Sequence, residues 1–151
     1  MPGDPITVFL KRLPGAEDLP LPVRMTDEAA GLDLRAAVPS PVTLNPGDIS
    51  VVPCGFAMAI PKGYEAQVRP RSGLASRHGV TLVNSPGTID SDYRGEVMVP
   101  LVNHGRQPFV VDRGMRVAQM LVLPVPPVRL VEVDELDDTG RGTGGFGHTG
   151  H

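Results

Sequence analysis

Hydrophobic residues occur along the chain in short runs, many of which alternate with polar residues, and turn-forming residues separate these runs at near-regular intervals. Alternation of this kind is typical of half-buried β-strands, and clusters containing proline and glycine are typical of turns. The expected strands lie at residues 6–10, 32–38, 48–52, 56–60, 64–69, 79–84, 96–103, 108–111, 117–123 and 128–133. This spacing predicts an all-β sandwich or barrel.

Two segments depart from the strand pattern. Residues 72–78 (SGLASRH) predict one short helix, with Ser72 placed to cap its first turn. After Val133 the chain becomes acidic and then rich in glycine. We therefore expect a β-barrel body over residues 1–133, followed by an acidic linker and a glycine-rich C-terminal arm over residues 134–151.

Composition narrows the possible functions. A chain of 151 residues with 40 % hydrophobic residues and a net charge of -3 predicts a single domain without a broad nucleic-acid surface. The single Cys54 has no partner for an internal disulfide, and the first residues lack a long apolar run. We therefore expect a cytoplasmic protein that does not enter a membrane.

The first two stretches with candidate chemistry combine charge with a strand. In AAGLDLRA (residues 29–36), Asp33 and Arg35 share one strand face, although they could be a solvent-facing pair. In PRSGLASRHG (residues 70–79), a strand ends at Arg71 and a helical turn begins at Ser72. A guanidinium, a hydroxyl and free N–H groups predict a phosphate cradle, although a simple helix cap would give the same pattern.

The third stretch, NSPGTIDSDYRGEV (residues 84–97), predicts a hairpin whose turn is SDYR. If Asp90 pairs with Gly95, then Gly87 falls opposite Met98, and open backbone there could hydrogen-bond a flat group such as a base edge. Asp90 in such a pocket could serve as a general base, with Tyr93 beside it. The competing interpretation is a hairpin turn without chemistry.

The last two stretches are a strand and the tail. In DRGMRVAQM (residues 112–120), Gln119 lies among apolar residues and must find partners or water, so it could also be a satisfied core amide. In RGTGGFGHTG (residues 141–150), glycines permit close approach to phosphates, Arg141 supplies charge and Phe146 can stack on a base. A disordered terminus is the alternative for the tail.

Taken together, in this order and at these spacings, the five stretches resemble the five motifs of the trimeric dUTP pyrophosphatases (dUTPases) along essentially the whole chain. The resemblance implies a distorted jelly-roll β-barrel with one short helix and a flexible C-terminal arm. It implies a homotrimer that hydrolyses dUTP to dUMP and pyrophosphate with Mg²⁺, at active sites that each draw on several subunits. That reaction limits uracil in DNA and supplies dUMP for dTMP synthesis.

The resemblance also implies roles for the catalytic and phosphate-binding residues. Asp90 would orient and deprotonate the water that attacks the α-phosphorus, and Gln119 would help to hold that water. Arg71, Ser72 and Gly73 would hold the phosphates.

For the nucleoside, the resemblance implies that Asn84 and the backbone around Thr88, Ile89 and Met98 read the uracil edge. Tyr93 would pack under the deoxyribose and leave no room for a 2′-hydroxyl.

Three further roles complete the resemblance. Asp33 would act on the Mg²⁺ shell through water, Arg141 would clamp the γ-phosphate, and Phe146 would cover the uracil when the arm closes. A glycine-rich arm with one aromatic residue can open to admit substrate and close to exclude water.

Two positions depart from the family pattern. Met115 stands where an acidic residue is usual, which is expected to alter a local salt bridge more than catalysis. Thr88 replaces a commoner aliphatic residue, although its role is mostly that of its backbone.

Zinc is not expected. The histidines are scattered, and His148 and His151 lack a third protein ligand nearby. The expected catalytic metal is Mg²⁺, held chiefly by the triphosphate.

Two other functions remain open at this point. A dCTP deaminase would share the trimeric fold and the nucleotide grip but use a glutamate in the pocket, which the run around Asp90 disfavours. A non-catalytic trimeric β-module would bind nucleotide or protein without releasing pyrophosphate from dUTP.

Overall fold

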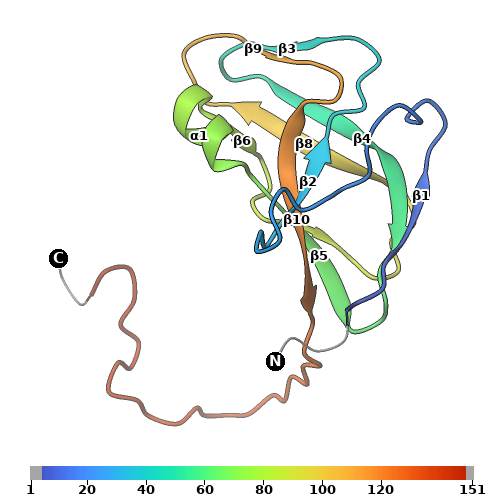
Figure 1. Cartoon of the computed structure of the whole chain (residues 1–151). Coiled ribbons are helices and arrows are strands. Elements are labelled where there is room, and N and C mark those ends of the chain that lie inside the picture. The colour runs from blue at the N-terminus through green and yellow to red at the C-terminus, as the bar shows by residue number, and fades with distance from the viewer. Residues whose placement is uncertain (1–4, 149–151) are drawn as a thin grey trace.

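The computed structural model describes residues 5–148, in which antiparallel strands form a body and the C-terminal segment leaves it (Figure 1). The elements are β1 (Phe9–Arg12), β2 (Leu32–Arg35), β3 (Val42–Leu44), β4 (Ile49–Ala59), β5 (Tyr64–Arg69), α1 (Ser72–His78), β6 (Val80–Leu82), β7 (Gly87–Ile89), β8 (Glu96–Asn103), β9 (Phe109–Val111) and β10 (Arg116–Pro124). The all-β prediction with one short helix is confirmed.

Two four-stranded sheets enclose one hydrophobic core. Their strand orders are β1-β4-β8-β6 and β2-β10-β5-β7, and the β3-β9 ribbon covers one end of the body (Figure 1). Alternate residues of β8 and β10 point inward, so Val99, Leu101 and Val117 are almost fully buried. Burial of Cys54 in the same core, with a smaller effect from the charge of Glu96, raises the pKa of its thiol to about 12, which keeps it neutral near pH 7.

Several details of the strand prediction were wrong. The expected strands at 48–52 and 56–60 form the single strand β4, whose register with β8 shifts between Pro53 and Ala57. The strand β3 was not expected, and β7 was expected only as one arm of the hairpin in the third motif. No strand lies at 128–133 within the described chain, where Val128 and Leu130 are highly exposed and have no sheet of their own to join.

The short helix has the predicted bounds but not the predicted cap. Arg71, in extended conformation, occupies the N-cap position, and no side chain caps the helix. Ser72 is instead the first helical residue, and its exposed hydroxyl does not cap the helix. The helix ends at Gly79, which adopts a left-handed conformation with φ of 68°.

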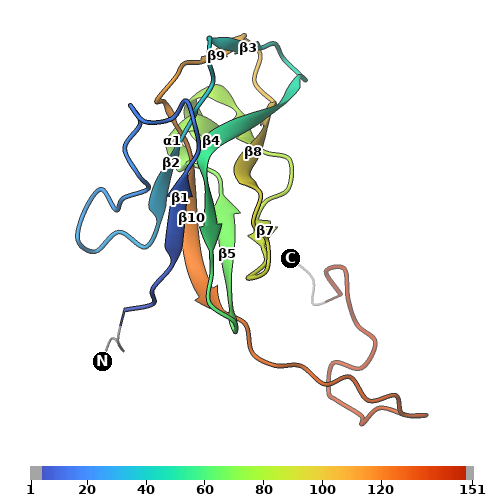
Figure 2. The same cartoon turned by 90° about the vertical axis from the view of Figure 1, so that its right-hand side faces the viewer.

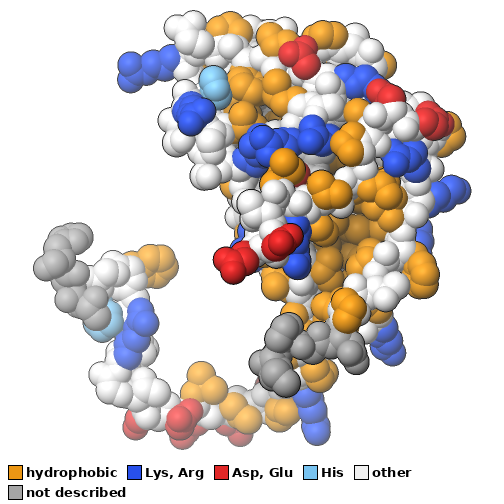
Figure 3. Space-filling model, in the orientation of Figure 1, with side chains coloured by type: hydrophobic (Ala, Val, Ile, Leu, Met, Phe, Trp, Pro, Cys, Tyr) orange, Lys and Arg blue, Asp and Glu red, His pale blue; other side chains and the backbone are white. Residues whose placement is uncertain are grey.

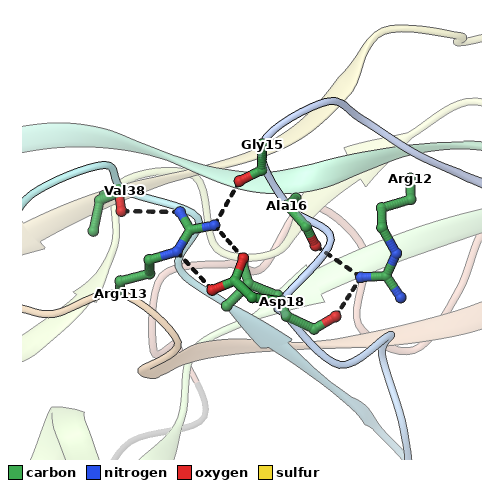
Figure 4. Close-up of polar contacts among 7 residues, drawn as sticks. Arg12, Gly15, Ala16, Asp18, Val38 and Arg113 are labelled. Atoms are coloured by element: carbon green, nitrogen blue, oxygen red, sulfur yellow. Dashed lines mark hydrogen bonds and ion pairs between the residues drawn. The ribbon is translucent and has the colours of Figure 1, made fainter.

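Two arginines fix the loop that leads from β1 towards β2 (Figure 4). Arg12 donates to the carbonyl oxygens of Ala16 and Leu19. Arg113, from the turn before β10, pairs with Asp18 at 2.6 Å and donates to the carbonyl oxygens of Gly15 and Val38. This arginine clamp joins the N-terminal loop to the β9–β10 turn.

Beyond Pro124 the described chain contains no further strand. The Val125 N–H still donates to the Gly63 carbonyl oxygen at 2.8 Å, and residues 129–148 extend away from the body (Figures 1 and 2). The proposed division at residue 133 stays a prediction. Within residues 5–148, no helix combines the length and the apolar character needed to cross a membrane.

Candidate active site

The third motif forms a pocket between the two sheets rather than a paired hairpin. β7 pairs with β5, placing Gly87 opposite Val68, whereas β8 pairs with β4 and β6. The predicted pairing of Gly87 with Met98 is therefore wrong, because β7 is the edge strand of one sheet and β8 belongs to the other. The two arms of the motif are splayed, which leaves a gap between them.

This gap consists of two adjoining cavities of about 210 and 50 Å³. Thr88, Ile89 and Met98 line both of them, Asn84 and Gly87 line the smaller, and Asp90 and Tyr93 line the larger. The structure thus brings the predicted uracil-reading and sugar-contacting residues to one slot. Its walls come from two sheets, and its backbone edges are partly unpaired.

Asp90 and Tyr93 lie at the open end of the slot. Asp90 directly follows β7 and is exposed, and its carboxylate makes no hydrogen bond or ion pair with any residue in 5–148. It also lines a larger cavity of about 1160 Å³ towards Tyr64. The Tyr93 hydroxyl donates to the carbonyl oxygen of Glu96 at 2.9 Å, which holds the ring against the hairpin.

The first, second and fourth motifs meet at a separate basic cluster. Asp33 of β2 pairs with the guanidinium of Arg116 at 3.0 Å, and Arg71 donates to the Arg116 carbonyl oxygen at 2.7 Å. Burial, followed by the charges of Arg116 and Arg35, lowers the pKa of Arg71, while Asp33 acts in the opposite direction. Figure 3 shows arginine and lysine side chains gathered across the middle of this face. Such a positive cluster suits a polyanion.

Gln119 belongs to the same cluster. In β10 it lies opposite Asp33 on one side and Arg69 on the other, and its amide donates to the Pro70 carbonyl oxygen at 3.1 Å. The side chain is half-buried, and its oxygen has no donor among the described residues. Gln119 is therefore a positioned amide at the edge of the site rather than a fully satisfied core group.

Ser72 and Gly73 begin α1 beside this cluster, and both are exposed. Arg71, immediately before them, is half-buried and held by its bond to β10. The predicted phosphate-binding residues are thus adjacent, with one fixed guanidinium and one free hydroxyl.

The hairpin slot and the basic cluster do not meet within one chain. Asp90 follows Ile89, which pairs with Ala66, whereas Arg71 lies five residues beyond Ala66 in the opposite direction along β5. At the rise of a β-strand, the six intervening steps separate Asp90 from Arg71 by about 20 Å. The predicted nucleoside slot and the predicted phosphate-binding residues are therefore apart on one chain, as two candidate partial sites.

The C-terminal arm contributes nothing to either partial site of its own chain. Arg141 donates to the Gly144 carbonyl oxygen within a local turn, and Phe146 is fully exposed. The arm projects away from the body in both views (Figures 1 and 2). The end of the fifth motif at residues 149–150, and His151, lie outside the described residues.

The donors present fit a metal held mainly by substrate. Within residues 5–148, no three acidic, histidine or cysteine side chains converge as metal ligands. Asp33 uses one carboxylate oxygen for Arg116, and its other oxygen remains able to accept a hydrogen bond from metal-bound water. That single carboxylate suits an outer-sphere contact with Mg²⁺.

The structure also identifies two residues that sequence reasoning missed. Arg116 links Asp33 to Arg71, a role visible only once β2, β5 and β10 are aligned. Gly31 packs so closely that a Cβ atom there would lie 2.5 Å from Oε1 of Gln119. Neither the salt bridge nor this close approach leaves a periodic signal in the sequence.

The structure places both residues that depart from the family pattern. Met115 packs against the core, so an apolar side chain fills the place of the usual acid. Thr88 is exposed beside the slot, and its backbone lies in β7 opposite Gln67.

Comparisons with known proteins agree with this geometry. The family model described as dUTPase matches residues 17–150. The deoxyuridine 5'-triphosphate nucleotidohydrolase of Maricaulis maris (strain MCS10) is 54 % identical over 147 residues, covering 96 % of this chain and 97 % of the relative.

Solved structures show the same fold. A Staphylococcus bacteriophage 80alpha dUTPase bound to dUpNHpp has a TM-score of 0.85 and 24 % identity, covering 96 % of this chain and 99 % of that one. A phage phi11 dUTPase from S. aureus, described with a structural Mg(II) ion, has a TM-score of 0.75 and 24 % identity, covering 85 % and 97 %. The order of the five motifs along the chain, the splayed hairpin slot and these matches together establish that the chain belongs to the dUTPase family.

Proposed function

We propose that this chain hydrolyses dUTP to dUMP and pyrophosphate by attack of an Asp90-activated water on the α-phosphorus. The observation that carries the proposal is the hairpin slot, whose base-sized gap ends at an unpaired, exposed carboxylate. Asp90 accepts a proton from the water while the oxygen of that water bonds to the α-phosphorus. The bond from that phosphorus to the oxygen bridging to the β-phosphorus breaks, and pyrophosphate leaves.

The slot selects the nucleoside. Asn84 and the backbone of Thr88, Ile89 and Met98 lie around a narrow cavity in which a flat uracil edge can exchange hydrogen bonds. Tyr93, held by its bond to the Glu96 carbonyl oxygen, occupies the space beside the sugar. A 2′-hydroxyl would collide with that ring, which disfavours UTP.

The basic cluster holds the phosphates. Arg71, Ser72 and Gly73 lie together at the start of α1, where a guanidinium, a hydroxyl and backbone N–H groups can contact phosphate oxygens. Gln119, with a free amide oxygen, holds the attacking water together with Asp90. Arg141 of the arm adds a cation at the γ-phosphate.

Mg²⁺, when bound to the triphosphate, neutralises phosphate charge and orients the phosphates for in-line attack. Asp33 is the residue we assign to its outer shell, because its second carboxylate oxygen is free to accept from a metal-bound water. Arg116 keeps that carboxylate in place through the 3.0 Å ion pair.

The complete site requires more than one chain, and we propose a homotrimer. The separation of about 20 Å between Asp90 and Arg71 supports a site in which the hairpin of one subunit meets the basic cluster of another. Exposed apolar residues support subunit contacts: Ile49 and Val51 of β4 are more than half exposed, and Met98 of β8 is nearly so. Apolar surface of this kind commonly marks protein contacts.

The arm completes the site from a neighbouring subunit. Residues 133–146 can span on the order of 40 Å when extended, which is enough to leave their own body and reach another pocket. Phe146, fully exposed in its own chain, then covers the uracil. The cytoplasmic setting expected from the sequence remains a prediction.

The direct test measures pyrophosphate release from dUTP, dCTP, dTTP and UTP, with Mg²⁺ and with excess EDTA. We expect rapid pyrophosphate release from dUTP and not from the other three nucleotides, and a much lower rate of release with EDTA. Deamination of dCTP would favour the deaminase alternative, and binding of dUTP without pyrophosphate release would favour a non-catalytic module.

A further inference from the structure

A basic pocket of about 310 Å³ lies at the C-terminal end of α1, outside the residues assigned to hydrolysis. Arg77 and His78 of the helix line one side, and Arg106 and Gln107 of the β8–β9 loop line the other. Phe109 of β9 also lines the pocket, with its ring centroid 5.0 Å from that of His78. In Figure 3, basic and histidine side chains gather in this region over α1.

Two glycines bring these basic segments together. Gly79 ends the helix, and the His104 N–H donates to its carbonyl oxygen at 2.8 Å. A Cβ atom on Gly105 would overlap the His78 carbonyl oxygen, and one on Gly79 would lie 2.6 Å from the Gly105 nitrogen. Only glycine at both positions allows this approach, which sets the sequence RHG (77–79) against HGR (104–106).

A buried amide makes the loop rigid. Asn103 is fully buried, and its side-chain N–H groups donate to the carbonyl oxygens of Leu44 and Gln107 at 2.9 and 2.8 Å. Its side-chain oxygen accepts from the Gly105 N–H at 2.8 Å. Burial of a polar side chain costs free energy unless its hydrogen-bonding groups find partners. Here two of the hydrogen bonds of Asn103, to Gly105 and Gln107, hold the loop in place. Arg106 therefore projects from a pre-organised backbone.

The charge of the pocket is uncompensated. No acidic side chain lines it, and neither Arg77 nor Arg106 forms an ion pair or a side-chain hydrogen bond within residues 5–148. Interaction with the helix dipole would explain Arg77 and His78 in the last turn. It does not explain Arg106 and Gln107, which come from a different element and face the same cavity.

We propose that this pocket binds a small phosphate-type anion, with pyrophosphate as its simplest representative, at a site separate from hydrolysis. Two guanidinium groups from opposite walls can each donate to phosphate oxygens, and the Gln107 amide adds a neutral donor. The volume corresponds to about ten water molecules, at about 30 Å³ each, which accommodates an anion of nine heavy atoms.

The test is calorimetric titration of the full-length chain. Titration with dUpNHpp first gives the number of nucleotide sites per chain, and pyrophosphate is then titrated into the protein saturated with dUpNHpp. We expect one pyrophosphate per chain, and binding at least about ten-fold weaker in Arg77→Gln/Arg106→Gln, because charge-assisted hydrogen bonds are lost. Lys11→Gln/Arg129→Gln, which removes the same charge from exposed positions elsewhere, should bind as the natural chain does.

The natural chain could bind two dUpNHpp molecules and the Arg77→Gln/Arg106→Gln variant only one. That result would support the pocket as a site that the phosphates of a nucleotide fill. Absence of pyrophosphate binding to a chain with one analogue site would overturn the proposal. Equal binding by the double variant and the control would also overturn it. If the natural chain did not bind dUpNHpp, the result would instead count against the proposed hydrolytic site. Failure of the anion pocket and failure of the proposed function are therefore distinguishable.

Discussion

Asp90 owes its proposed role to its position more than to its environment. The residue follows the last pair of β7, at the mouth of the slot, and its carboxylate has no protein partner among the described residues. Both oxygens of this carboxylate can therefore contact a water molecule at that point. Asp33 is the contrasting case, because Arg116 occupies one of its oxygens.

We predict that Asp90→Asn retains binding of dUpNHpp and lowers turnover of dUTP by about two orders of magnitude or more. The amide can still hydrogen-bond to water but cannot accept its proton. Steady-state pyrophosphate release and calorimetric binding of dUpNHpp provide the two measurements. Turnover close to that of the natural chain would remove Asp90 from the mechanism.

Gly31 affects the same chemistry indirectly. Its added methyl in Gly31→Ala would meet Cβ and Cδ of Gln119 at 3.1 and 3.3 Å as well as the amide oxygen. Gln119 would have to rotate away from Pro70, so we predict a kcat lower by about ten-fold or more with dUpNHpp binding retained.

A double-mutant cycle provides the control for Gly31. In the Gln119→Ala background the amide is absent and only the 3.1 Å contact with Cβ remains, so Gly31→Ala should have little further effect on kcat. If the two substitutions lowered kcat independently, Gly31 would act through something other than Gln119.

At the scale of elements, the arginine clamp connects the first loop to the turn before β10. The hydrogen bond from Arg113 lowers the pKa of Asp18 below its usual value, against a smaller opposing effect of desolvation. Asp18 in the unfolded chain therefore binds a proton at a higher pH than in the folded chain. The resulting stability is fully present above the unfolded pKa and is lost as the pH falls through the folded pKa.

We predict that Asp18→Asn lowers the Tm at pH 7, and that this difference becomes smaller as the pH falls below the usual pKa of an aspartate. The effect should be modest, because the Asp18 side chain is 62 % exposed. Thermal unfolding monitored by circular dichroism between pH 2 and 7 measures it. No difference in Tm at pH 7 would mean that the backbone contacts of Arg12 and Arg113 alone hold the loop, and a difference that stayed constant over this range would mean that the charge of Asp18 is not its cause.

The whole molecule is incomplete as a monomer in this proposal. The slot, the basic cluster and the arm are three separate parts, and the arm projects from the body (Figure 2). If each site takes its hairpin from one subunit and its arm from another, inactive variants of the two parts can complement each other.

We predict that Asp90→Asn chains and chains truncated after Asp138 are each inactive but recover dUTP hydrolysis when refolded together. At equal mixing, each donor is competent half the time, so roughly a quarter of the sites should work. If one subunit supplied both the hairpin and the arm, no mixture could contain a complete site. Activity no higher than the sum of the two separate variants would contradict the shared-site model.

The sequence alone determined the fold class, the motif order and the single helix, because these depend on local periodicity and on turn residues. The alternation in residues 64–69 and 96–103 corresponds to β5 and β8 with the predicted bounds. It also determined the set of candidate site residues, since each motif is contiguous in the chain.

Tertiary structure decided which of these residues meet. Pairing of β7 with β5 instead of β8 opened the slot, and the alignment of β2, β5 and β10 brought Asp33, Arg71 and Arg116 together. The close approach of Gly79 to Gly105 likewise joined segments 26 residues apart. Such contacts depend on how sheets and loops pack, which a one-dimensional pattern of polar and apolar residues does not encode.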